Sequence, residues 1–165
     1  MVNKKPSRTS PVPVRHDFGV LLNLAFGAFK AELHQAMSRA GFDDLGSSFG
    51  YVFRLLAERP KNLRDIAEAL GMTAPGALKI VNDMVAKGYV ERLEHTEDAR
   101  QKLLGLTPRA RKAMRTAHAF HEAFESELAS RVGARDTQAA RGLLEAIVDA
   151  ADARSSDGPI RLRPL

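Results

Sequence analysis

Residues 62–92 read NLRDIAEALGMTAPGALKIVNDMVAKGYVER, and this stretch decides the fold. Asn62 and Thr73 each precede a run in which apolar residues recur three and four positions apart, so each is expected to cap a helix. Gly71 separates the two runs and accepts the left-handed backbone that a tight turn requires. The stretch therefore predicts two helices joined by a turn of a few residues, the second ending near Lys87 and Gly88.

The spacing of small and apolar residues within these helices predicts a helix-turn-helix. Two helices that cross through a short turn need a small residue at the crossing, and Ala67 lies four positions before Gly71. The wedge between the helices must be filled by apolar side chains, and the candidates are Ile66, Leu70, Met72, Ala77 and Ile80.

A hairpin is expected directly after this motif. Residues 89–93 (YVERL) and 102–106 (KLLGL) are typical of short strands, and the polar stretch 95–101 joins them as a long tip. A helix-turn-helix followed by such a hairpin is the winged form, which is a far more specific pattern than the two helices alone.

The remaining chain predicts helices over about 17–40, 47–57, 107–132 and from Asp136, as the cap, to about 152. The expected fold class is mainly α with a small β-hairpin: a winged helix-turn-helix core over about 45–107, flanked by helices over about 17–40 and 107–152. Residues 1–16 hold three prolines and show no period, so we expect a disordered basic arm before a domain of residues 17–153. Residues 154–165 are expected to form a flexible tail.

Composition bounds the function. The chain of 165 residues has no cysteine, hence no disulfide, and no apolar run that approaches the roughly 20 residues of a membrane span. The first 16 residues also lack the apolar stretch of a signal peptide, so a cytoplasmic protein is expected. The net charge of +5 comes from the two ends, since Lys61–Lys102 carries seven basic and seven acidic residues. DNA binding by the core must therefore depend on how its charges are arranged.

Residues 62–111 resemble the MarR family of bacterial regulators. The resemblance is carried by LRDIAEALGM (63–72), which leads into IVNDMVAKGYVER (80–92), and by DARQKLLGLT (98–107), which is similar to the family's wing signature. It implies a homodimeric regulator of transcription that binds a pseudo-palindromic site in double-stranded DNA, expected to act as a repressor. The flanking helices then correspond to the family's dimerisation helices.

The resemblance also implies which residues meet DNA. The N-terminal end of the second helix of the motif would enter the major groove, while Arg100 would enter the minor groove with Asp98 orienting it. Ala74–Ala77 holds small residues where polar base-reading residues are common in the family, so specificity is expected to depend on the wing and on DNA shape. The predicted DNA-binding residues are Arg64, Thr73, Ala74, Gly76, Lys79, Asn82, Arg92, Asp98, Arg100 and Lys102.

Members of the family commonly bind a small phenolic or anionic effector between the dimerisation helices and the DNA-binding lobe. The residues here that are expected to frame such a pocket are Phe18, Phe26, Phe49, Tyr51, Phe53 and Arg54. Aromatic residues at helical spacing are equally typical of an ordinary hydrophobic core.

Other classes of function have less support. His118 and His121, with Glu122 nearby, have a spacing that permits metal binding, but paired histidines on a helix are more typical of a surface, so no metal or cofactor is expected. The sequence contains no recognisable catalytic constellation, so no enzyme is expected. The alternative is a winged-helix protein-interaction module that does not bind DNA, which the near-neutral core favours and the Asp98–Arg100 wing pattern does not.

Overall fold

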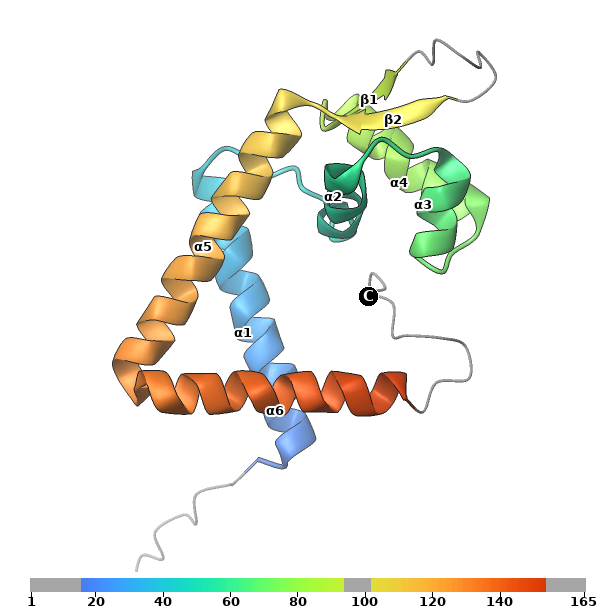
Figure 1. Ribbon diagram of the computed structural model, residues 1–165. Helices are drawn as coiled ribbons and strands as arrows, with labels where there is room; N and C mark the ends of the chain where they lie inside the picture. Colours follow the sequence, from blue (N-terminus) through green and yellow to red (C-terminus); the bar gives the residue numbers. More distant parts are fainter. Residues whose placement is uncertain (1–15, 94–101, 154–165) are drawn as a thin grey trace, which may run out of the picture. The chain divides into compact units, whose positions relative to one another are not determined.

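Eight elements make up the part of the chain that the computed structural model describes, residues 16–93 and 102–153. In chain order they are α1 (Phe18–Arg39), α2 (Phe49–Glu58), α3 (Leu63–Ala69), α4 (Ala74–Ala86), β1 (Val90–Leu93), β2 (Leu103–Leu106), α5 (Pro108–Val132) and α6 (Ala134–Asp152) (Figure 1). This confirms the mainly helical fold with a small hairpin. The predicted basic arm, except for His16, and the predicted tail lie outside the described residues. Within the described helices, none is long and apolar enough to cross a membrane.

Side-chain caps begin three of the helices, as the sequence predicts. Asn62 Oδ1 accepts a hydrogen bond from the Asp65 N–H at 2.9 Å, and Thr73 Oγ1 accepts one from the Gly76 N–H at 3.3 Å. Thr107 Oγ1 does the same for Ala110 at 3.2 Å. Each bond satisfies an N–H group that has no partner within its helix, which fixes where the helix starts.

The predicted cap at Asp136 is wrong. Helix α6 begins at Ala134, with Gly133 in the cap position, because Gly133 takes a positive φ of 92° and turns the chain directly from α5 into α6. Asp136 lies in the first turn of α6 instead. A carboxylate there still interacts favourably with the positive end of the helix.

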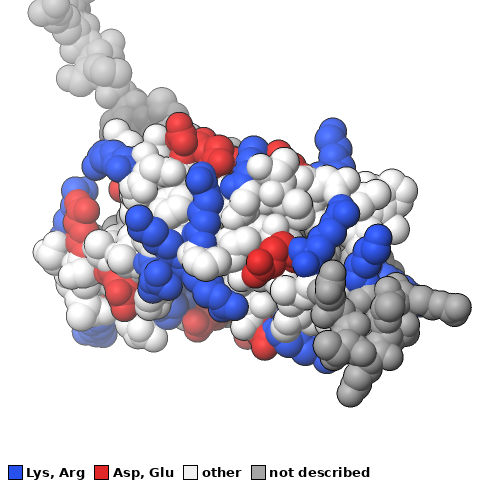
Figure 2. All heavy atoms as spheres, turned by 90° about the horizontal axis from the view of Figure 1, so that it is seen from above, with Lys and Arg blue, Asp and Glu red and all other residues white. Residues whose placement is uncertain are grey.

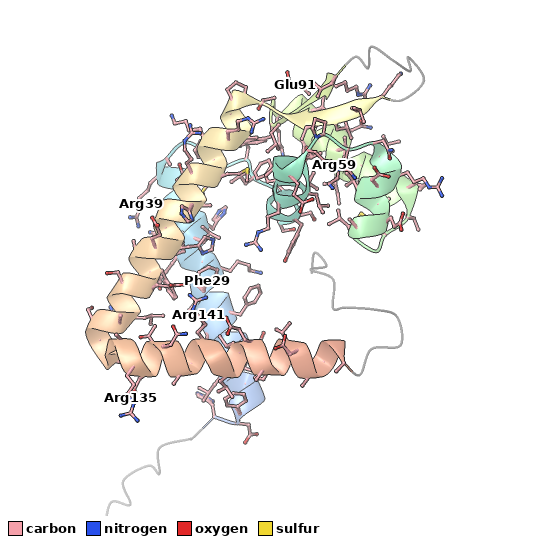
Figure 3. All side chains as sticks on the ribbon, in the orientation of Figure 1. Phe29, Arg39, Arg59, Glu91, Arg135 and Arg141 are labelled. Atoms are coloured by element: carbon pink, nitrogen blue, oxygen red, sulfur yellow. The ribbon has the colours of Figure 1, made fainter. Side chains whose placement is uncertain are left out.

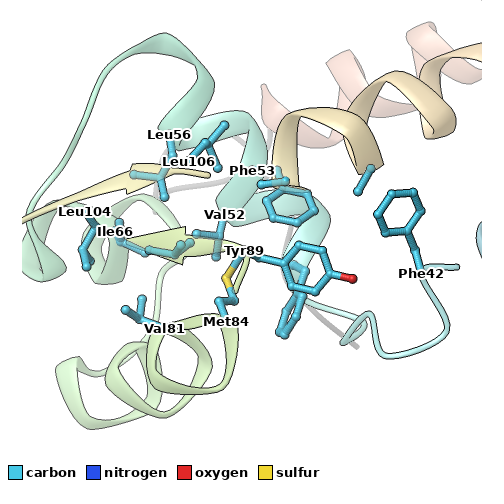
Figure 4. Close-up of a cluster of buried hydrophobic side chains, with 14 of the residues drawn as sticks. Phe42, Val52, Phe53, Leu56, Ile66, Val81, Met84, Tyr89, Leu104 and Leu106 are labelled. Atoms are coloured by element: carbon cyan, nitrogen blue, oxygen red, sulfur yellow. The ribbon is translucent and has the colours of Figure 1, made fainter. Parts of the chain in front are cut away.

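The hydrophobic core is formed by the helix-turn-helix, the hairpin, α2 and the start of α5 (Figure 4). The predicted wedge residues take part: Ile66, Leu70 and Ala77 are buried, and Met72 and Ile80 pack half-buried against the core. The largest fully buried side chains are Tyr89, Ile66, Met84, Val52, Val81 and Val90.

The hairpin is antiparallel, with Val90 opposite Leu106 and Leu93 opposite Leu103. Lys61 adds a backbone pairing that the sequence does not reveal, because its N–H donates to the Leu104 carbonyl at 3.3 Å and its carbonyl accepts from the Leu104 N–H at 2.9 Å. A single paired residue has no periodic signal. This bridge fixes the start of α3 against the hairpin.

The chain divides into two compact units, one ending at Glu32 and one beginning at Leu33. In the first unit, α1 exposes the large apolar side chains Phe18, Val20, Leu21, Leu24 and Phe26. In the second unit, α6 exposes Leu143, Leu144, Ile147 and Val148, and the ion pair between Arg141 and Glu125 links α6 to α5 (Figure 3). Among the side chains described in α6, none is buried.

Candidate nucleic-acid interface

The N-terminal end of α4 is exposed and small. Thr73, Ala74 and Pro75 are exposed, and Gly76 is half-buried. Pro75 fits the first turn of the helix because the N–H that it lacks would have no partner there. This end of α4 therefore offers a surface on which another molecule can approach the helix backbone closely.

Helix α4 has one buried face and one exposed face. Ala77, Val81 and Met84 recur at helical spacing and are buried, whereas Lys79 and Asn82 are exposed. Leu78 lies on the exposed face as well, with 42% of its surface accessible. Sequence analysis missed Leu78, although its place outside the buried stripe of Ala77, Val81 and Met84 was a usable signal.

The hairpin contributes a cation to the exposed face of α4. Arg92, on β1, donates from Nη2 to Asn82 Oδ1 on α4 at 3.0 Å. Gly88 makes this contact feasible, because its positive φ of 71° turns the chain between α4 and β1. The bond holds the Arg92 guanidinium beside the exposed face of α4. By contrast, Lys87 is paired with Asp83 at 2.9 Å.

The remaining predicted DNA-binding residues fall into two groups. Arg64, in the first turn of α3, and Lys102, just before β2, are exposed. Asp98 and Arg100, the predicted wing pair, lie outside the described residues. On the face seen in Figure 2, basic and acidic side chains are interspersed.

The predicted effector residues are divided between the two compact units and differ in burial. Phe49 and Phe53 are 2% and 5% exposed, and both rings contact Tyr89 with centroids 5.7 Å apart, so these two side chains belong to the hydrophobic core. Tyr51 is half-buried and Arg54 is exposed on α2, while Phe18 and Phe26 are exposed on α1 in the other compact unit.

The two histidines of α5 have different surroundings. His118 Nε2 lies 3.4 Å from Glu122 Oε1 and is exposed, whereas His121 is half-buried. Burial lowers the pKa of His121, and the positive charge of Arg54 on α2 lowers it further. Within residues 16–93 and 102–153, no group of three His, Cys, Asp or Glu side chains is placed to hold a metal ion.

Sequence analysis also missed a polar cluster next to the core. Asp44, Tyr89 and Arg109 come from three separate segments and are hydrogen-bonded to one another. Their separation in the sequence hides the contact. The one usable signal is Tyr89 itself, since a tyrosine in an otherwise apolar core needs a partner for its hydroxyl group.

Comparison with known proteins agrees with this architecture. Residues 50–101 match a family model described as MarR family. A search of curated protein sequences gives no significant match. Among solved structures, a mutant of S. aureus MepR is 18% identical, with a TM-score of 0.65 over 82% of this chain and 99% of that one.

Two further structures have the same fold. Another S. aureus MepR mutant, bound to an oligodeoxyribonucleotide, is 19% identical, with a TM-score of 0.57 over 83% of this chain and 99% of that one. E. coli MarR in its apo form is 18% identical, with a TM-score of 0.59 over 81% of this chain and 98% of that one. The MarR-family match thus covers α2, the helix-turn-helix and β1, and the whole described chain has the winged-helix fold of these solved structures.

Proposed function

We propose that the chain is a sequence-specific, double-stranded DNA-binding regulator of transcription that acts as a homodimer on a pseudo-palindromic operator, as a repressor. The observation that carries the proposal is the exposed face of α4, with its small first turn and with Arg92 held beside it by Asn82. The S. aureus MepR mutant of the same fold, bound to an oligodeoxyribonucleotide, supports it.

Helix α4 has the dimensions for the major groove. Its 13 residues span about 20 Å, and the groove is about 12 Å wide. Ala74 and Gly76 would allow close approach and apolar contact with thymine methyl groups. They cannot form the paired hydrogen bonds with purines that longer polar side chains form. Thr73 and Lys79 would reach base edges, and Arg92 with Asn82 would contact phosphate.

The wing would supply the second point of contact. We propose that Arg100 enters the minor groove and that Asp98 orients it, because a narrow minor groove concentrates negative potential. Arg64 and Lys102, both exposed, would add phosphate contacts. Specificity would then depend on the wing and on DNA shape more than on direct reading of bases by α4.

Arg100→Ala tests the wing. We expect it to lower affinity for the operator by about tenfold or more, measured by fluorescence anisotropy. The control is Arg135→Ala, which removes an exposed arginine from α6 (Figure 3). If Arg100→Ala changes affinity by less than about twofold, the proposed role of the wing is wrong.

A second copy of the chain is the proposed partner of the exposed apolar side chains on α6 and the start of α1. Exposed apolar side chains clustered on one helix mark an interface, and identical chains pair most simply through a two-fold axis. Such a dimer would place the two α4 helices about 34 Å apart, one turn of DNA. Light scattering or sedimentation velocity measures the oligomeric state.

An anionic aromatic effector is proposed for the region between α2 and α5. The positive charge of Arg54 on α2 lowers the pKa of His121 on α5, and half-buried Tyr51 lies on the same helix as Arg54. A carboxylate bound there would pair with the Arg54 guanidinium. Benzoate should raise the Tm of the protein, and neutral benzyl alcohol should not. Arg54→Ala should remove the benzoate effect.

The competing proposal is a winged-helix module that binds a protein. Exposed Leu78 on α4 and the balanced charge of residues 61–102 favour it. Two experiments decide between the DNA-binding regulator and the protein-binding module. Bound duplexes are selected from random DNA, and binding to the most enriched duplex is then measured as the salt concentration rises. A regulator should enrich one pseudo-palindrome and lose affinity steeply as salt rises. Absence of enrichment would favour the protein-binding module.

A further inference from the structure

Asp44, Tyr89 and Arg109 form a polar joint where three segments meet. Asp44 lies in the connection between α1 and α2, Tyr89 lies between α4 and β1, and Arg109 is in the first turn of α5. The Tyr89 hydroxyl group donates to Asp44 Oδ1 at 2.5 Å. Arg109 Nη2 donates to both Asp44 carboxylate oxygens at 3.1 Å and to the Tyr89 hydroxyl oxygen at 3.2 Å.

Tyr89 connects this joint to the hydrophobic core. Its ring is fully buried against Phe49 and Phe53, while its hydroxyl group points out of the core, toward the segment that carries Phe42 (Figure 4). The Arg109 guanidinium also lies over the Tyr89 ring, 4.8 Å from its centroid. The position of Arg109 is therefore fixed by hydrogen bonds and by ring contact together.

Backbone hydrogen bonds join the same segments. The Thr107 N–H donates to the Tyr89 carbonyl at 3.1 Å, and Thr107 Oγ1 donates to the Gly88 carbonyl at 2.7 Å. Helix α4 ends at Ala86, three residues before Tyr89, and α5 begins at Pro108. The joint therefore lies where the end of α4 meets the start of α5.

The joint has more influence on geometry than on stability. The Asp44 and Arg109 side chains remain 32% and 44% exposed, and ion pairs at that exposure contribute little to the free energy of unfolding. A planar guanidinium that binds a carboxylate and a hydroxyl group at the same time nevertheless restricts the relative orientation of the segments that carry them. Three weak contacts from three segments can thus fix an angle without dominating the stability of the fold.

We propose that Asp44, Tyr89 and Arg109 are positioning residues for DNA binding, which hold α5 at one angle to α4 and so set the distance between the two α4 helices of a dimer. This inference rests on the proposed function, because it requires a homodimer on two half-sites. None of the three residues is proposed to touch DNA.

A spacer series provides the test. The selected operator is synthesised with its half-sites moved by −1, 0 and +1 base pair, each step rotating one half-site by roughly 35° about the DNA axis. Kd values are measured for each duplex and for a single half-site. The wild-type chain should lose about tenfold or more in affinity at either altered spacing.

Three variants should flatten this preference. Tyr89→Phe removes only the hydroxyl group, Asp44→Asn removes the carboxylate charge, and Arg109→Lys keeps the charge but loses the planar fork. For each we expect the spacing preference to fall to about threefold or less, with half-site affinity and Tm close to wild type. Asp43→Asn is the matched control, since it removes an exposed carboxylate next to the joint, and it should keep the full preference.

The outcomes separate the two proposals. If wild-type protein prefers one spacing and all three variants keep that preference, the joint is only structural and the inference is wrong. If Asp43→Asn reduces the spacing preference as much as Asp44→Asn does, the loss of negative charge alone explains the result, and the inference is wrong. If wild-type protein binds neither the full operator nor the half-site, the proposed function fails and the inference fails with it.

Discussion

Ile66 and Ile147 are the same amino acid in the middle of a helix, yet Ile66 on α3 is fully buried and Ile147 on α6 is 38% exposed. The first belongs to the winged-helix core, where α2, α3, α4 and the hairpin cover one another's apolar faces. The second belongs to an apolar stripe that none of the described residues of the second compact unit buries. The difference teaches that helical periodicity predicts an apolar face but not whether its partner lies in the same chain.

The largest expected effect comes from cutting into the winged-helix core. Ile66→Ala should lower the free energy of unfolding by about 2–5 kcal/mol, because it leaves a cavity among close-packed side chains. Ile147→Ala should cost less than about 1 kcal/mol at protein concentrations where the chain is monomeric. Urea unfolding of both variants measures this, and equal losses would contradict the difference between the two regions.

The second effect concerns the exposed stripe of α6. Ile147→Asp should raise the dimer dissociation constant by about tenfold or more, because a carboxylate would be buried without a partner in the interface. Gln138→Asp introduces the same charge about two and a half turns away, on the opposite face of the same helix, where we expect little change. Sedimentation velocity over a range of concentrations makes the comparison. A stable wild-type monomer would show that α6 has no such role.

A third, intermediate effect is expected at the α4 surface. Arg92→Ala should weaken binding to the selected operator and to a scrambled duplex by a similar factor, about three- to tenfold. It should also reduce the slope of log affinity against log salt concentration by about one, the contribution of one phosphate contact. Asn82→Ala should have part of this effect, since Asn82 holds Arg92 at 3.0 Å. Glu91→Ala is the control, because neighbouring residues of a strand point to opposite faces. A loss confined to the selected operator would indicate that Arg92 reads bases.

Gly76→Ala is expected to have two smaller effects, a gain in the stability of α4 and a loss of affinity for DNA. A Cβ atom there would lie 3.4 Å from Thr73 Oγ1, an ordinary contact, so Gly76→Ala should stabilise α4 by about 0.5–1 kcal/mol. The same methyl group should weaken DNA binding if the α4 backbone lies close to the bases. Tm and Kd measured on one preparation report both. A gain in stability with unchanged Kd would remove Gly76 from the interface.

The smallest effect is a pH dependence at the polar joint. The hydrogen bond from Tyr89, together with the Arg109 charge, lowers the pKa of Asp44 below its ordinary value of 3.8. A carboxyl group whose pKa is lowered on folding stabilises the protein above its unfolded pKa, and this contribution is lost as the pH falls through the folded pKa. Asp44→Asn should therefore destabilise the protein by less than about 1 kcal/mol at pH 7, and the difference from wild type should shrink below about pH 4. Urea unfolding at pH 7, 5 and 3.5 measures it, and a difference that grows toward acid would contradict this assignment.

Local sequence signals predicted most of the fold because each acts over a few residues. Asn62, Thr73 and Thr107 begin their helices by bonding to an N–H group three residues ahead, a signal that can be read directly from the sequence. The start of α6 could not be read in the same way, since a positive φ at Gly133 replaced the expected cap at Asp136.

The candidate site was less predictable because its contacts join distant residues. Exposed Lys79 and Asn82 follow from the buried stripe of α4, but the bond from Arg92 to Asn82 spans the turn at Gly88. The joint of Asp44, Tyr89 and Arg109 spans 65 residues of chain. Phe49 and Phe53, predicted to frame a pocket, are part of the core, since helical spacing does not distinguish the two.

The most direct test of the account is a titration of the wild-type chain against the selected full operator and a single half-site, with stoichiometry and Kd read from the same anisotropy curves. The account predicts two chains per full operator and an affinity for it at least about a hundredfold higher than for the half-site. One chain per duplex with equal affinities, or no binding to either DNA, would contradict it.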